Sequence, residues 1–129
     1  MRANKYGNKK VEIDGYKFDS QAEARRYQEL KLLEKAGKIK HLALQPKFEL
    51  VPKTKKRRAV TYTADFAYRE IKLIMEYDLI SDTTYGSPIW IEVVEDVKSP
   101  ATAKDKTYIV KRNLFEYQNP DIDFREVMM

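Results

Sequence analysis

Residues 89–98 read Ile-Trp-Ile-Glu-Val-Val-Glu-Asp-Val-Lys, which is the most strand-like run of the chain. β-branched and aromatic residues dominate it up to Val97, which favours extended backbone with both faces packed. We therefore expect Ile89 to Val97 to form a strand in the middle of a sheet. Lys98, Ser99 and Pro100 follow, and the proline ends the strand.

The segments around this strand alternate between helical and extended patterns. Ser20 and Glu23 have the spacing of a capping box, good helix formers follow, and Gly37 supplies the stop. The patterns predict a short strand or hairpin over 11–18, a helix over 21–36, strands over 47–51 and 61–68, an extended hairpin insertion over 69–88, a helix over 102–117 and a last strand over 123–127. This order indicates an α/β domain built around one mixed sheet.

Composition limits the classes of protein and of site. The 129 residues carry 25 Lys and Arg against 20 Asp and Glu, giving a net charge of +5, and 43% are hydrophobic. One packed domain is expected over 11–129, and the apolar runs are far shorter than the ~20 residues of a membrane span. With no cysteine and one histidine, His41, the chain has few ligands for zinc. Any metal would be a hard cation held by oxygen.

Two basic segments stand out. Residues 1–10 are polar and basic and predict a flexible arm, without the apolar region of a secretory signal, so we expect a cytoplasmic protein. Residues 53–58 carry five positive charges in six positions. Such a run repels itself and predicts an exposed loop.

The acidic end of the central strand is a candidate site. Side-chain alternation places Asp96 and Lys98 together on one face and Glu95 on the other. A carboxylate beside an ammonium suits metal-assisted phosphodiester hydrolysis, in which the acid holds Mg²⁺ and the amine orients water. The alternative is an ordinary ion pair at a strand end, worth about 0.5 kcal/mol.

Two further acids lie where a carboxylate is unusual. Glu23 shares the helix face of Tyr27 and Leu30, which should pack on the sheet, although a capping-box Glu needs no other role. Asp65 stands inside an expected strand, where aspartate is depleted, although aspartates at strand ends are common.

Taken in order, Glu23, Asp65 and the Asp96-x-Lys98 triplet resemble the PD-(D/E)xK nuclease superfamily. The wider pattern, KYGNKK, DGYKFDSQAEARRY, LKLLEKAGKI, LQPKFEL, YTADFAY, VVEDVKS and YIVKRNLF, is similar to small phage and prophage proteins of that superfamily. Ala64 stands where the proline that names the motif would be.

The resemblance implies a restriction-endonuclease-like or Holliday-junction-resolvase-like α-β-β-β-α-β core and a Mg²⁺-dependent DNA endonuclease, with Mn²⁺ as a substitute. It assigns Glu23, Asp65, Asp96 and Lys98 to catalysis and the three acids to the metal. It further implies double-stranded, branched or nicked DNA as substrate, in phage recombination, replication or repair in the host cytoplasm.

Positive charge should carry DNA binding, because the acids of the site repel phosphate. The residues expected to contact DNA are Lys9, Lys10, Lys55, Lys56, Arg57, Arg58, Lys104, Lys111 and Arg112. Gln45 and Tyr108 are candidates for lining the site, although each has an ordinary structural explanation as a turn residue or a packing residue.

Other functions stay open at this point. The same fold could serve a non-catalytic nucleic-acid-binding module, or a phage adaptor whose basic segments recognise an acidic partner. A membrane surface is the weakest alternative, since no basic amphipathic helix is present. Many small nucleases form homodimers, but we find no self-complementary apolar stripe that argues for one here.

Overall fold

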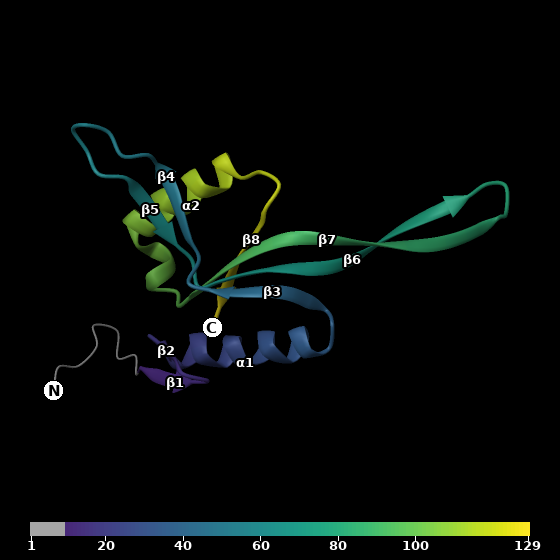
Figure 1. Cartoon of the computed structure of the whole chain (residues 1–129), viewed down its shortest axis with the longest axis horizontal. Coiled ribbons are helices and arrows are strands. Elements are labelled where there is room, and N and C mark those ends of the chain that lie inside the picture. The colour runs from purple at the N-terminus through teal and green to yellow at the C-terminus, as the bar shows by residue number, and fades with distance from the viewer. Residues whose placement is uncertain (1–9) are drawn as a thin grey trace.

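The computed structural model describes residues 10–129, in which two helices and eight strands are arranged around one sheet (Figure 1). The elements are β1 (Val11–Ile13), β2 (Tyr16–Phe18), α1 (Gln21–Lys35), β3 (Ile39–Leu44), β4 (Lys47–Val51), β5 (Val60–Thr63), β6 (Phe66–Asp78), β7 (Thr83–Lys98), the 3₁₀ turn η1 (Thr102–Lys104), α2 (Lys106–Gln118) and β8 (Asp123–Met128). Every predicted helix and the last strand are present.

The main sheet has four strands in the order β3-β6-β7-β8. β7 pairs antiparallel with β6 and parallel with β8, so the sheet is mixed and the predicted central position of the strand is confirmed. The parallel pair requires a crossover, which α2 provides. Two small antiparallel sheets, β1-β2 and β4-β5, stand beside the main one.

Helix α1 packs on one face of the main sheet. The Ser20 hydroxyl accepts a hydrogen bond from the Glu23 N–H at 3.1 Å, as the capping pattern predicted, and Gly37 takes a φ of +76° beyond the last turn. Tyr27 and Leu30 are buried beneath the helix. The core of this face consists of Phe18, Ala24, Tyr27, Leu30, Ile39, Phe66, Tyr68, Val93 and Val97.

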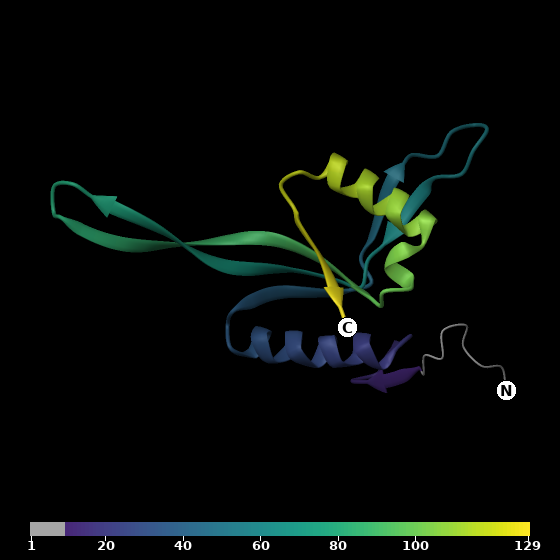
Figure 2. The ribbon, with the colours of Figure 1, turned by 180° about the vertical axis from the view of Figure 1, so that it is seen from behind.

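Helix α2 and the β4-β5 hairpin build a second core on the other side of the sheet (Figures 1 and 2). Phe115 is fully buried there, with ring centroids 4.6 Å from Phe48 and 5.6 Å from Tyr62. The buried residues of this core are Leu50, Tyr62, Ala64, Val94, Tyr108 and Phe115. Adjacent residues of β7, such as Val93 and Val94, therefore enter different cores.

The strand predicted over 61–68 is wrong, because the chain breaks at Ala64-Asp65 into β5 and β6. The Ala64 N–H donates to the Pro46 carbonyl, and the Asp65 carbonyl accepts from the Gln45 N–H. The paired strands β3 and β6 therefore leave the main sheet at the same point and continue as the paired strands β4 and β5 of the small sheet. Tyr62 belongs to the α2 core and Phe66 to the α1 core, so these two residues lie on different faces of the sheet although they are four positions apart.

Two other predictions need correction. Strand β3 was not predicted, because its alternation is interrupted by a bulge between Lys40 and Ala43, where His41 adopts a left-handed φ of +58°. The helix predicted over 102–117 is divided at Asp105, whose extended backbone and side chain form the N-cap of α2.

The hairpin predicted over 69–88 is confirmed and continues β6 and β7 as a two-stranded arm beyond the body of the molecule (Figures 1 and 2). No helix formed by residues 10–129 is both long and apolar enough to cross a membrane.

Candidate active site

The end of β7 carries two adjacent buried acids that point to opposite faces. Asp96 is 2% exposed and its Oδ1 lies 2.9 Å from Lys98 Nζ, which the alternation predicted. Its Oδ2 accepts a hydrogen bond from the Tyr62 hydroxyl. Glu95 is fully buried and faces α1 instead, so it is separated from Lys98 by the strand.

Asp65 lies beside Asp96 because of the break between β5 and β6. The register of β6 with β7 ends at Phe66 opposite Glu95, which leaves Asp65 next to Asp96. The Asp65 N–H donates to the Glu95 carbonyl at 3.1 Å, and its Oδ2 accepts from the Val97 N–H at 2.6 Å. Two hydrogen bonds with the backbone of β7 therefore hold Asp65 in place, one through its N–H and one through its carboxyl.

Glu23 in the first turn of α1 completes the predicted set. It shares the lining of a cavity of about 410 Å³ with Asp65 and Gln45, and the lining of a second cavity of about 140 Å³ with Lys98. Burial raises the pKa of Glu23, and the charge of Asp19 adds to that rise. The structure thus brings Glu23, Asp65, Asp96 and Lys98 together and places Gln45 at the same cavity.

The crowding of acids shows most clearly at Asp65. Burial raises the pKa of the Asp65 carboxyl to about 8, helped by a hydrogen bond with Asp96 and by the negative charges of Glu23 and Asp96. The Val97 N–H acts in the opposite direction. At neutral pH the Asp65 carboxyl therefore keeps its proton, which a cation could replace.

The donor set fits a cation that keeps part of its water. Within residues 10–129, no three side chains of His, Cys, Asp or Glu come close enough to hold a metal ion by themselves. Zinc sites need three or four protein ligands, whereas Mg²⁺ is commonly bound by one or two carboxylates, with water and phosphate oxygens in the other positions. Asp65 and Asp96 supply two neighbouring carboxyls, the number that such a Mg²⁺ site uses.

Tyr62 and Glu126 were not predicted as site residues from the sequence, whereas Tyr108 was predicted to line the site and lies beside Lys98. The Lys98 ammonium lies 4.3 Å from the centre of the Tyr108 ring, and the Tyr108 hydroxyl donates to Glu126 at 2.6 Å. Arg112 also contacts Glu126, at 2.9 Å. The period-2 pattern around Tyr62 and the i, i+4 spacing of Tyr108 and Arg112 can be recognised in the sequence. The residues that these side chains contact, Asp96 and Glu126, come from other segments and cannot be recognised in the same way.

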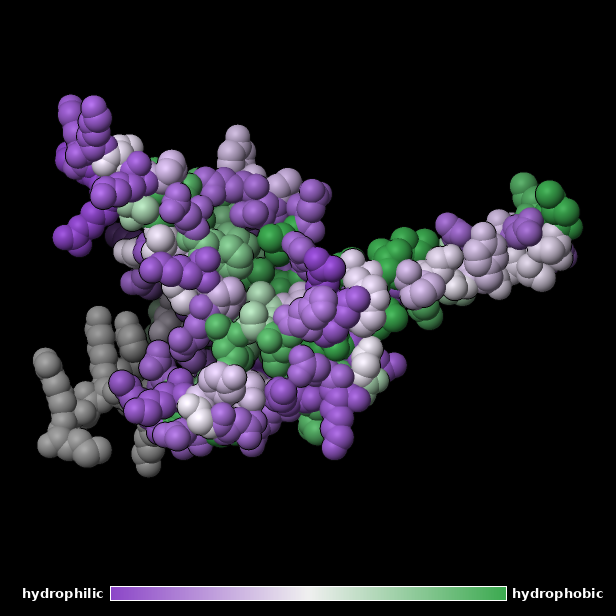
Figure 3. Space-filling model, viewed as in Figure 1, coloured by the Kyte–Doolittle hydropathy of each residue, from purple (hydrophilic) through white to green (hydrophobic). Residues whose placement is uncertain are grey.

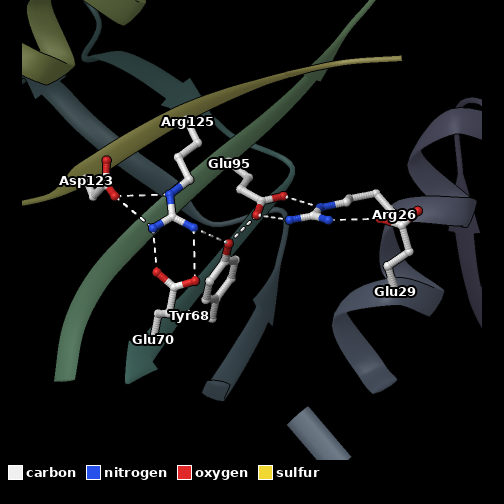
Figure 4. Close-up of polar contacts among 7 residues, drawn as sticks. All are labelled: Arg26, Glu29, Tyr68, Glu70, Glu95, Asp123 and Arg125. Atoms are coloured by element: carbon white, nitrogen blue, oxygen red, sulfur yellow. Dashed lines mark hydrogen bonds and ion pairs between the residues drawn. The ribbon is translucent and has the colours of Figure 1, made fainter. Parts of the chain in front are cut away.

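On the opposite face of β7, Glu95 anchors α1 (Figure 4). Arg26 forms two bonds to its carboxylate, at 2.8 and 2.7 Å, and the Tyr68 hydroxyl donates a third. The pair with Glu95 raises the pKa of Arg26. Because Arg26 lies one turn after Glu23, this contact also fixes the distance of Glu23 from the end of β7.

The same network continues across β6 and β8. Arg125 contacts Glu70 at 2.5 Å, Asp123 at 2.8 Å and the Tyr68 hydroxyl at 3.5 Å (Figure 4). Hydrogen bonding with Arg125 lowers the pKa of Glu70. These contacts join β8 to β6 across the central strand β7.

The cations expected to contact DNA have different surroundings. The loop over 53–58 is exposed throughout, as predicted. Lys10 and Lys104 are exposed, Lys111 is half-buried, and Lys9 lies outside the described residues, as does the rest of the predicted arm over 1–9. Arg112 pairs with Glu126 and lies near the Tyr108 ring, so part of its charge is balanced within the protein.

Comparison with known proteins adds a family. Residues 3–85 match the sequence pattern of a protein family of unknown function, DUF1064, over more than half of the chain. The chain belongs to the DUF1064 family. The DUF1064 match includes Glu23, Gln45 and Asp65 and ends within β7, before Asp96 and Lys98. No curated protein and no solved structure matches the chain.

Replacing Arg26 with Ala should lower the free energy of unfolding by about 3–5 kcal/mol, because Glu95 would stay buried without its cation. Arg25→Ala, at the exposed neighbouring position, should change it by less than about 0.5 kcal/mol. Chemical denaturation measures both. The double variant Arg26→Ala/Glu95→Gln should be more stable than Arg26→Ala alone, and equal stability would contradict this account of Glu95.

The raised pKa of Asp65 predicts a pH-dependent stability. Because the unfolded chain loses this proton near pH 4 and the folded protein only near pH 8, the stability contributed by protonated Asp65 declines between these values. The wild type should lose stability between pH 5 and pH 8 in chelator-containing buffer. Asp65→Asn should lose roughly 1–3 kcal/mol less over the same range. Parallel stability curves for wild type and variant would show that Asp65 ionises normally.

Proposed function

We propose that the protein is a Mg²⁺-dependent DNA endonuclease of the PD-(D/E)xK type. The observation that carries the proposal is the meeting of Asp65, Asp96 and Lys98, from segments far apart in sequence, at one end of the central strand. Glu23 approaches the same place from α1. Stability alone gives no reason to bury two neighbouring carboxyls that force one of them to keep a proton.

The order of the core elements supports this type of nuclease. Leaving out the two small sheets, the chain runs α1, β3, β6, β7, α2 and β8, which is the α-β-β-β-α-β order of the superfamily. The candidate acids occupy the corresponding elements, namely the first helix, the start of a middle strand and the end of the next strand.

The two carboxyls of Asp65 and Asp96 would hold the metal, with Glu23 contacting it through water. A bound Mg²⁺ would polarise the phosphate and lower the pKa of an attacking water. Asp65 must lose its proton for this role, so metal affinity should increase with pH up to about 8. The Tyr62 hydroxyl holds the Asp96 carboxylate in a fixed orientation.

Lys98 would orient the attacking water and stabilise negative charge as the phosphorus is attacked. Its ammonium is positioned by Asp96 at 2.9 Å and by the face of Tyr108 at 4.3 Å. Both contacts are favourable for an ammonium and hold it in a fixed position. The side chain keeps 20% of its surface exposed, so it remains accessible from the cavity that Glu23 also lines.

Positive charge outside the site would bind the DNA backbone. The exposed loop over 53–58, together with Lys104 and Lys111, lies on the α2 side of the molecule. The described residues contain no helix with a known base-reading arrangement, so recognition would depend on shape and backbone. Branched or nicked DNA is a suitable substrate class for such recognition.

Purified wild type should cleave at least one of linear, nicked, flapped or four-way DNA substrates, and only with Mg²⁺ or Mn²⁺. Asp96→Asn and Lys98→Ala should lower the rate by about 10²–10⁴-fold without loss of DNA affinity. The matched control is Glu92→Gln, on the same face of β7 but exposed. Gel-based cleavage and binding assays measure both quantities.

Calorimetry with Mn²⁺ tests the metal site without cleavage and should detect binding that Asp65→Asn abolishes. DNA binding without metal binding or cleavage would favour a non-catalytic nucleic-acid-binding module. The absence of DNA affinity at moderate salt would favour an adaptor protein instead.

Removing charge from the basic loop should weaken DNA binding independently of sequence. The triple variant Lys55→Ala/Lys56→Ala/Arg57→Ala should reduce the salt dependence of log affinity by about 1 for each lost phosphate contact. The control removes Lys31, Lys35 and Lys38, in and just after the C-terminal half of α1, with equal change in net charge. Equal losses of affinity in both variants would reject a specific role for the loop.

A further inference from the structure

The β6–β7 arm is a long hairpin that the body of the molecule does not cover. Beyond Ile71 no β3 residue pairs with β6, and before Val93 no β8 residue pairs with β7. The two views show the paired strands leaving the body as a ribbon with no helix beside it (Figures 1 and 2). Both outer backbone edges are thus free, and an isolated two-stranded hairpin is only marginally stable in water.

One face of the arm is apolar along most of its length. The register places Ile71 opposite Trp90, Leu73 opposite Pro88 and Met75 opposite Gly86, and cross-strand partners share a face. Leu73 is 66% exposed, and Met75 and Tyr77 are also largely exposed. Apolar side chains are visible on the arm in the space-filling view (Figure 3).

The opposite face is mixed. It presents Lys72, Glu76 and Asp78 together with Ile74 and Tyr85. The arm thus has the alternation of a sheet with one buried apolar face. Nothing within the described chain covers the apolar face that carries Leu73 and Met75. At the tip, Leu79 and Ile80 are 84% and 98% exposed.

The charge of the arm differs in sign from that of the whole chain. Residues 73–91 contain Glu76, Asp78 and Asp82 and no Lys or Arg, a charge of −3, while the chain carries +5. An acidic apolar arm repels the phosphates of nucleic acid. It suits a basic protein surface, and the remainder of this same chain carries +8, the difference between +5 and −3.

The exposed apolar area is close to what a dimer needs. Six side chains contribute, namely Leu73, Met75, Tyr77, Leu79, Ile80 and Trp90. With about 150 Å² for a fully exposed large side chain, their exposed fractions give roughly 600 Å² per copy. Stable interfaces bury about 800 Å² per partner, and the free strand edges and polar neighbours would supply the rest.

We propose that the β6–β7 arm binds a second copy of this chain. The apolar faces of two arms pack together in antiparallel orientation about a twofold axis, which makes the contact closed and self-complementary. Each tip then approaches the base of the other arm with Asp82, whose carboxylate accepts a hydrogen bond from Tyr77 of the apolar face. Lys40 and Arg69 supply positive charge on that face of the base.

Sedimentation velocity of the full chain at about 50 μM tests the dimer. Wild type should sediment with twice the monomer mass of 15.2 kDa. Leu73→Asp/Met75→Asp, on the apolar face, should be monomeric. Ile74→Asp, the same chemical change on the opposite face, should stay dimeric. All three proteins should give the same far-ultraviolet circular dichroism, because the changed residues lie outside both cores.

Charge reversal tests the orientation of the arms. Asp82→Lys should weaken self-association at least tenfold, and so should Arg69→Glu. An equimolar mixture of the two variants should recover dimerisation, because both tip-to-base contacts of the mixed dimer then join opposite charges. Failure to recover would overturn the antiparallel arrangement.

A monomeric wild type at 50 μM would overturn the dimer proposal, even if the arm captured another protein. Equal effects of Leu73→Asp/Met75→Asp and Ile74→Asp would overturn the assignment of the interface to the apolar face. These measurements use no metal and no DNA, so their outcome is independent of the nuclease activity.

Discussion

Two neighbouring carboxylates at the end of the central strand impose the main constraint on this protein. Glu95 and Asp96 are both buried, and strand alternation sends them to opposite faces. Each needs its own partners, because an unpaired buried charge costs several kcal/mol. Arg26 and Tyr68 satisfy Glu95 from the α1 side, whereas Lys98 and Tyr62 satisfy Asp96 from the α2 side. The two layers of the molecule are thereby linked to one short stretch of β7.

The two faces of this stretch differ in how completely their charges are balanced. Glu95 accepts two hydrogen bonds from the Arg26 guanidinium and one from the Tyr68 hydroxyl, and the Arg26 contact holds α1 in position. Asp96 shares its surroundings with Asp65 and Glu23, so negative charge exceeds what Lys98 alone can neutralise, and Asp65 keeps a proton. An excess of oxygen ligands beside a single ammonium supports the proposal of a cation site on this face and not on the other.

The arm extends the same two central strands in the opposite direction. Near the body, neighbouring strands and helices cover both faces, while further out only the hairpin remains. Apolar residues still alternate along β6 in this outer part. We therefore propose that a second copy of the chain covers the apolar face of the arm. A twofold arrangement of the arms would make each copy contribute one catalytic site to the dimer, linking the two proposals without making either depend on the other.

Local sequence determined most of the elements, since capping at Ser20, the stop at Gly37 and the β-branched run before Lys98 act over a few residues. The contact of Asp96 with Lys98 also followed from alternation. Other features depended on tertiary structure. The break at Ala64-Asp65 is held by a hydrogen bond from the Gln45 N–H and by bonds to the carbonyls of Pro46 and Glu95. The bulge at His41 interrupts the alternation of β3, which therefore was not predicted. The pairing of Arg26 with Glu95 joins residues 69 positions apart. Such contacts form only when distant segments pack together, and no local pattern specifies them.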